Sequence, residues 1–82
     1  MNKKRAKRDT YPYKLKDGNK IVYIGQTKEP ERREEEHRAE GKKFTRMDRE
    51  FPCSEETALK KEQEEISRYR RSHGGRGPKY NK

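Results

Sequence analysis

Two short apolar segments on either side of a turn limit what this 82-residue chain can fold into. Residues 11–16 alternate, with Tyr11, Tyr13 and Leu15 on one face, which is the pattern of a β-strand. Residues 17–19, Asp-Gly-Asn, predict a turn because Gly and Asn tolerate positive φ. Residues 21–25, IVYIG, predict the return strand. Because this second segment is apolar on both faces, we expect it to be the central strand of a sheet.

The length of the turn sets the register of this hairpin. A three-residue turn centred on Gly18 places Tyr13 opposite Tyr23. A two-residue Gly-Asn turn pairs Tyr13 with Ile24 instead, so the sequence leaves both registers open. An ordinary cross-strand pair of aromatic residues accounts for the two tyrosines without any function.

The charged segment 29–40 predicts a helix. Pro30 suits its first position, Glu31 suits the positive end of the helix dipole, and Gly41 suits the stop. Arg33 and His37, four residues apart, share one face. That face belongs either to a solvated, salt-bridged helix or to a cleft. Residues 43–51 then alternate and predict a third strand.

A second helix is predicted over residues 55–71, with Ser54 as its N-cap. One arc of this helix, about 100° wide, contains Ala58, Leu59, Glu62, Ile66 and Tyr69. Glu62 lies in the middle of the arc, and burying an unpaired carboxylate is costly. Glu62 is therefore expected either to form an ion pair, with Arg33 as the partner, or to bind a metal ion.

The charge balance points to nucleic acid as the partner. The chain has 24 Lys and Arg against 15 Asp and Glu, a net charge of +9. Residues 1–10 are interpreted as a disordered basic arm, which is either a solubilising tail or an arm that lies along phosphates, and residues 11–82 as the folded domain. The cations expected to contact nucleic acid are Lys3, Lys4, Arg5, Lys7, Arg8, Arg32, Arg76 and Lys79.

Composition excludes several classes of protein. Hydrophobic residues make up 23% of the chain and charged residues 48%, which is typical of disorder. The clustering of the apolar residues instead predicts a small fold with a free energy of unfolding below the ~5 kcal/mol of typical domains. We expect no membrane association and no secretion, since the chain has no long apolar run, signal-peptide core or apolar basic helix. A single cysteine, Cys53, excludes an internal disulfide and fits the reduced cytoplasm.

The motifs in this order resemble those of the GIY-YIG nuclease family. Tyr23-Ile24-Gly25 matches the second half of the family signature, and Arg33 and His37 match its downstream Arg and His. The first half is altered, because Tyr11-Pro12-Tyr13 stands in place of Gly-Ile-Tyr. The segment Ala58-Leu59-x-x-Glu62 is similar to the family's helix with a metal-binding Glu, and Asn81 matches an Asn near the end of the domain. The resemblance covers residues 11–81.

The resemblance implies a fold, an activity and roles for individual residues. The fold is a small α/β (α+β) sandwich, with a three-stranded antiparallel sheet flanked by helices. The activity is metal-dependent DNA cleavage with little intrinsic sequence preference, using one Mg²⁺ or Mn²⁺ ion bound by Glu62. The implied catalytic residues are Tyr13, Tyr23, Arg33, His37 and Asn81.

Several alternatives stay open at this level. Tyr13 is the leading candidate for the general base, but a phenol with a pKa of about 10 is a poor base at pH 7. Tyr23 is a second candidate, and a proton relay from Tyr13 to His37 is a third. Target choice would come from DNA structure, a recruiting partner or a second copy of the chain. The rivals to the enzyme are a non-catalytic nucleic-acid-binding module and a basic protein that folds on its partner; RNA is an alternative substrate.

Overall fold

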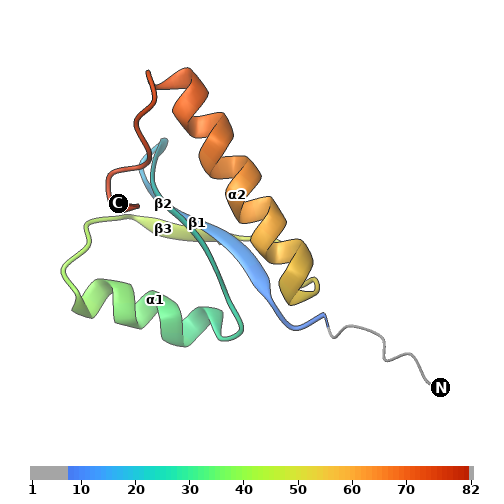
Figure 1. Ribbon diagram of the computed structural model, residues 1–82. Coiled ribbons are helices and arrows are strands. Elements are labelled where there is room, and N and C mark those ends of the chain that lie inside the picture. The colour runs from blue at the N-terminus through green and yellow to red at the C-terminus, as the bar shows by residue number, and fades with distance from the viewer. Residues whose placement is uncertain (1–7, 82) are drawn as a thin grey trace.

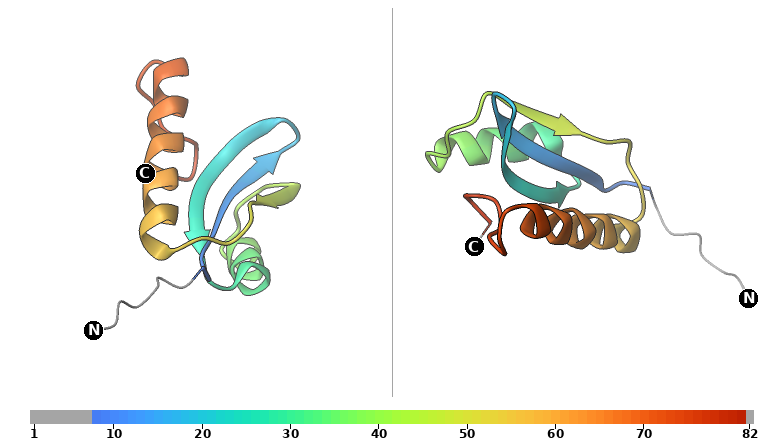
Figure 2. Two further views of the ribbon diagram at one scale, coloured as in Figure 1. Left: turned by 90° about the vertical axis from the view of Figure 1, so that its right-hand side faces the viewer. Right: turned by 90° about the horizontal axis from the view of Figure 1, so that it is seen from above.

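The computed structural model describes residues 8–81 and contains three strands and two helices. In chain order these are β1 (Tyr11–Asp17), β2 (Lys20–Thr27), α1 (Pro30–Ala39), β3 (Arg46–Arg49) and α2 (Glu55–Ser72). The strands form one antiparallel sheet, which lies between the two helices (Figures 1 and 2). The predicted α+β class, with a three-stranded antiparallel sheet flanked by helices, is confirmed.

The strand order is β2-β1-β3, so β1 and not β2 is central. The prediction was wrong because it took apolarity on both faces of β2 as a sign of a strand on each side. The outer edge of β2 is instead covered by the end of the chain. The backbone N–H of Tyr80 donates to the carbonyl of Val22 at 2.8 Å, and the Asn81 side chain bonds both backbone groups of Ile24. These bonds protect an edge that would otherwise present unpaired groups.

The hairpin adopts neither of the two registers that the sequence left open. The turn has two residues, 18 and 19, and an irregularity in the pairing then shifts the register by one position. Tyr13 therefore lies opposite Gly25. The rings of Tyr13 and Tyr23 still stack at a centroid distance of 5.9 Å, so the two phenols are near neighbours.

The apolar core is small and lies mainly between the sheet and α1. Its buried members are Tyr13, Leu15, Val22 and Phe44, and Tyr23, Met47 and Tyr80 pack against them. On the other face of the sheet, Ala58 of α2 is completely buried. Leu59, which the sequence placed on the apolar arc of this helix, is 47% exposed, so the buried stripe of α2 runs from Ala58 through the half-buried Glu62 and Ile66.

The ends of the elements follow the local signals. Ser54 caps α2 as predicted, since its Oγ accepts a hydrogen bond from the backbone N–H of Thr57 at 3.1 Å. Thr10, which the sequence placed in the basic arm, is buried and exchanges two backbone hydrogen bonds with Cys53. Thr10 therefore belongs to the fold. No helix within residues 8–81 has the length and apolarity required to cross a bilayer.

Candidate active site

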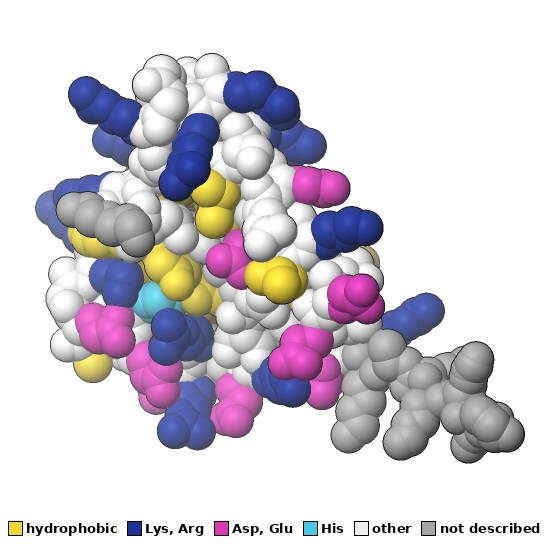
Figure 3. Space-filling model, in the orientation of Figure 1, with side chains coloured by type: hydrophobic (Ala, Val, Ile, Leu, Met, Phe, Trp, Pro, Cys, Tyr) yellow, Lys and Arg dark blue, Asp and Glu magenta, His cyan; other side chains and the backbone are white. Residues whose placement is uncertain are grey.

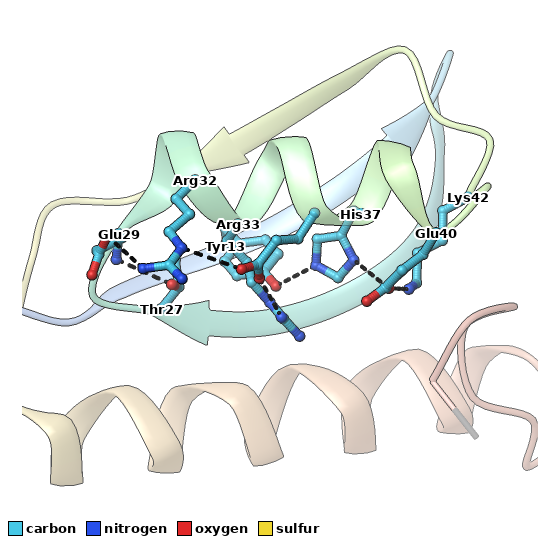
Figure 4. A network of polar contacts seen from close by, with 9 residues as sticks. Tyr13, Thr27, Glu29, Arg32, Arg33, His37, Glu40 and Lys42 are labelled. Carbon is cyan, nitrogen blue, oxygen red and sulfur yellow. Dashed lines mark hydrogen bonds and ion pairs between the residues drawn. The ribbon is translucent and has the colours of Figure 1, made fainter.

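Tyr13, Tyr23 and His37 form a cluster between the sheet and α1. Tyr13 and His37 are buried, and the Tyr13 Oη lies 2.8 Å from the His37 Nε2 (Figure 4). The Tyr23 ring is tilted against the imidazole at a centroid distance of 4.7 Å. A hydroxyl bonded to a buried imidazole nitrogen is an arrangement that can pass a proton.

Gly25 allows the two tyrosine rings to lie over the strand. A Cβ atom at this position would lie 2.7 Å from the Tyr23 Cε2 and 2.9 Å from the Tyr13 Oη. Both distances are shorter than van der Waals contact, so any side chain here displaces the rings. Glycine is therefore required at this position of the Tyr-Ile-Gly segment for a steric reason that the sequence alone does not reveal.

Burial shifts the pKa values of Tyr13 and His37 in opposite directions. Loss of solvent, and then the neighbouring Tyr23, raises the pKa of the Tyr13 phenol, so Tyr13 is protonated at neutral pH. Loss of solvent, and then the Lys42 and Arg33 cations, lowers the pKa of His37, so its imidazole is neutral. In the tautomer with the ring proton on Nδ1, the Tyr13 hydroxyl donates to the His37 Nε2.

The Nδ1 atom of His37 has no hydrogen-bond partner among residues 8–81. The Glu40 carboxylate lies 3.8 Å away, beyond hydrogen-bond distance, and also pairs with Lys42. Glu40 is close enough to stabilise a positive charge that forms on the ring. The imidazole thus lies between the Tyr13 hydroxyl on one side and this carboxylate on the other (Figure 4).

These pKa shifts predict a pH range of maximum stability. Below about pH 6.5 the unfolded chain binds a proton on His37 before the folded state does, so stability falls as pH decreases. Above about pH 10 the unfolded chain loses the Tyr13 proton first, so stability falls as pH increases. Urea unfolding should show that the free energy of unfolding of the wild type decreases on both the acid and the alkaline side of this range. The alkaline decrease should be smaller for Tyr13→Phe. Parallel curves for the two proteins would contradict the shift at Tyr13.

Arg33 extends from α1 past the edge of β2 (Figure 4). Its Nη1 donates to the Glu36 Oε1 at 2.8 Å, and its side chain is 37% exposed. Together with Gln26 and Glu36 it lines a groove of about 350 Å³ between the end of β2 and the start of α1. A guanidinium in a groove can bind a phosphate through two parallel hydrogen bonds.

Glu62 is half-buried and forms no ion pair with Arg33, so the predicted pairing of these two residues is wrong. Its Oε1 instead accepts a hydrogen bond from the Gln26 Nε2 at 3.1 Å. Gln26 thus touches Glu62 on one side and lines the Arg33 groove on the other. Sequence reasoning missed Gln26. Its position directly after Gly25 on the strand, facing α2, is the signal that could have identified it.

The carboxylate of Glu62 is a ligand of the kind that hard divalent cations take, whereas Gln26 turns its amide nitrogen toward that carboxylate. Mg²⁺ is often held by one or two carboxylates, with water and substrate phosphate completing the octahedron. Residues 8–81 contain no group of three or more His, Cys, Asp or Glu residues able to hold an ion. Any ion at Glu62 therefore takes most of its ligands from water and phosphate.

Asn81 lies beside β2, but both halves of its amide are in use. Its Oδ1 accepts from the Ile24 backbone N–H at 2.7 Å, and its Nδ2 donates to the Ile24 carbonyl at 2.9 Å. Asn81 therefore braces the strand next to Tyr23. The second N–H of the Nδ2 group has no hydrogen-bond partner among the described residues.

The positive charge is concentrated at the C-terminal end of α2. On α1, Arg32 pairs with Glu29 and Glu36. The segment 66–82, in contrast, contains no acidic residue. Its exposed cations without an ion-pair partner among the described residues are Arg70, Arg71, Arg76 and Lys79, and the end of the molecule formed by α2 is rich in Lys and Arg (Figure 3). Of the cations predicted to contact nucleic acid, Lys3, Lys4, Arg5 and Lys7 lie outside the described residues, and Arg8 is exposed.

Comparison with protein-family models, curated proteins and solved structures finds no match for this chain.

Proposed function

We propose that this protein is a metal-dependent endonuclease that hydrolyses DNA phosphodiester bonds. The observation that carries the proposal is the buried hydrogen bond between the Tyr13 hydroxyl and the His37 Nε2, close to a groove that Arg33 lines together with Gln26, the partner of Glu62. Binding alone requires no carboxylate in a site for phosphate. A site that must activate water does require a base, and this cluster can supply one.

His37 is the final proton acceptor in this scheme. A water molecule gives its proton to the Tyr13 oxygen while the Tyr13 proton passes to the His37 Nε2, so no free phenolate forms. The lowered pKa of His37 keeps the imidazole neutral and able to accept. Of the three bases open at the level of sequence, the relay through Tyr13 to His37 is the one that this geometry favours.

Arg33 binds the phosphate by exchanging its ion pair with Glu36 for one with the phosphate. In the absence of substrate its guanidinium is bonded to Glu36 beside the tyrosines. A phosphate that enters the groove offers two oxygens to the same planar fork and displaces the carboxylate. That displacement also opens a path to the Tyr13 hydroxyl, which is otherwise buried. A divalent ion bound at Glu62 would polarise the phosphate and neutralise the leaving oxygen.

The test is cleavage of labelled duplex, branched and single-stranded DNA by the wild type and Tyr13→Phe, with Mg²⁺ or Mn²⁺ and with EDTA. We expect cleavage that requires metal and falls by about 10²- to 10⁴-fold in Tyr13→Phe, the usual contribution of a general base. DNA affinity and far-UV circular dichroism should be unchanged. Equal cleavage by both proteins would exclude the relay.

The unpaired cations at the end of α2 favour a second candidate, a nucleic-acid-binding module without catalysis. Tight, salt-sensitive binding with no cleavage by the wild type would support it. The same assay with labelled RNA distinguishes the two nucleic acids. A second copy of the chain or a recruiting partner would supply the target choice that the small domain lacks.

A further inference from the structure

The C-terminal half of α2 and the β1–β2 turn enclose a cleft that the proposed reaction does not use. Its volume of about 570 Å³ falls within the range of small-ligand sites. Asn19 lines it from the turn and Lys20 from the start of β2, and Tyr69 and His73 line it from α2 and its C-cap. The cleft thus combines aromatic rings with polar and charged groups.

Two of the lining rings form a flat platform. The rings of Tyr69 and His73 are 3.7 Å apart at their centroids and only 3° from parallel. The His73 ring is held in place because its Nδ1 donates to the Tyr69 carbonyl at 2.8 Å. His73 is exposed and Tyr69 half-buried, so the stacked pair is accessible from the cleft. A third flat ring could extend this stack, and nucleobases stack on aromatic side chains in this way.

The groups around the platform suit a nucleobase and its phosphates. The Nε2 of His73 and the amide of Asn19 have no hydrogen-bond partner among the described residues and can bond the edge of a base. The carboxylate of Asp17 also lines the cleft and can accept a hydrogen bond from the amino group of a base, whereas Glu65 is already paired with Lys14 and Arg68. Lys20 is exposed with no ion-pair partner in residues 8–81 and is available to a phosphate.

We infer that this cleft binds an unpaired nucleobase of a nucleic-acid strand, stacked on Tyr69 and His73, with the adjoining phosphate on Lys20. A base inside a duplex is already stacked and cannot enter, so the site selects strands with an unpaired segment. Tyr69 follows Glu62 by seven residues on the same face of α2, about 10 Å along the helix axis. The inference deepens the proposed function, on which it rests, by placing an unpaired base close to the bond to be cut.

The test uses the whole chain in EDTA, so that binding is measured without cleavage. The probe is 2-aminopurine within a single-stranded oligonucleotide and within the matching duplex. Tyr69→Leu removes the aromatic ring, Tyr69→Phe retains it as the matched control, and His73→Ala provides a variant at an exposed position. Circular dichroism and urea unfolding establish that each variant is folded.

We expect the wild type and Tyr69→Phe to quench the probe in the single strand. Tyr69→Leu and His73→Ala should bind the single strand about five- to a hundredfold more weakly, the usual effect of losing one stacking ring. Duplex affinity should be the same for all four proteins. An equal loss on duplex and single strand, or no loss on either, would overturn the inference. Tight binding of AMP alone would also overturn it, because the site would then be one for free nucleotides. A protein that binds as expected but never cuts would refute only the nuclease.

Discussion

Replacement of Glu62 by Gln is expected to reduce DNA cleavage by about a thousandfold while leaving DNA affinity unchanged. Gln has nearly the same shape, and its amide oxygen can still accept the hydrogen bond from Gln26. Gln lacks the negative charge with which Glu62 would hold a divalent cation. A divalent ion held there would supply several kcal/mol of charge stabilisation in the transition state, and each 1.36 kcal/mol corresponds to about a factor of ten in rate. Residues 8–81 offer no cluster of ligands that could replace the lost carboxylate.

Single-turnover rates across a Mg²⁺ titration provide the measurement, with fluorescence anisotropy for DNA affinity. Glu64→Gln is the matched control, because it removes the same charge from an exposed position on the same helix. It should cleave at the wild-type rate. Equal losses in the two variants would mean that only the overall charge of α2 matters, and full activity in Glu62→Gln would place the metal elsewhere.

The second large effect is expected at Gly25. Gly25→Ala should destabilise the fold by about 1–3 kcal/mol, the usual cost of overpacking. The added Cβ would lie within 3 Å of both the Tyr23 ring and the Tyr13 hydroxyl, and it is the buried Tyr13 that has little room to move. In a domain whose free energy of unfolding is only a few kcal/mol, this loss unfolds a measurable fraction of the molecules. In those that stay folded, the displaced hydroxyl no longer bonds the His37 Nε2, so cleavage falls as well.

Urea unfolding followed by circular dichroism checks this result. Gly77→Ala is the control, because a Cβ at this position would lie 3.4 Å from its nearest neighbour, the Asn81 carbonyl oxygen, and so causes no severe overlap. Its effect should stay within about 0.5 kcal/mol, as for most surface substitutions. A similar change in stability for the two variants would show that the tyrosines tolerate a side chain beneath them.

The sequence by itself determined the local elements and the class of fold. Alternation of apolar residues predicted the hairpin, Pro30 marked the start of α1, and Ser54 marked the start of α2. The spacing of four between Arg33 and His37 placed both on one face of α1. Each of these signals acts within a few residues of the chain, where backbone geometry and capping bonds decide the outcome.

Only the tertiary structure decided the strand order, the register and the partners of the site residues. The edge of β2 is covered by residues 80–81, almost sixty positions along the chain, which no local pattern indicates. Glu62 bonds Gln26 and not Arg33, since Arg33 already has Glu36 one turn away on its own helix. His37 is buried because β1 brings Tyr13 against it. These contacts depend on how distant segments pack together. Because the core is small and closely packed, a change of a few atoms in one side chain alters them.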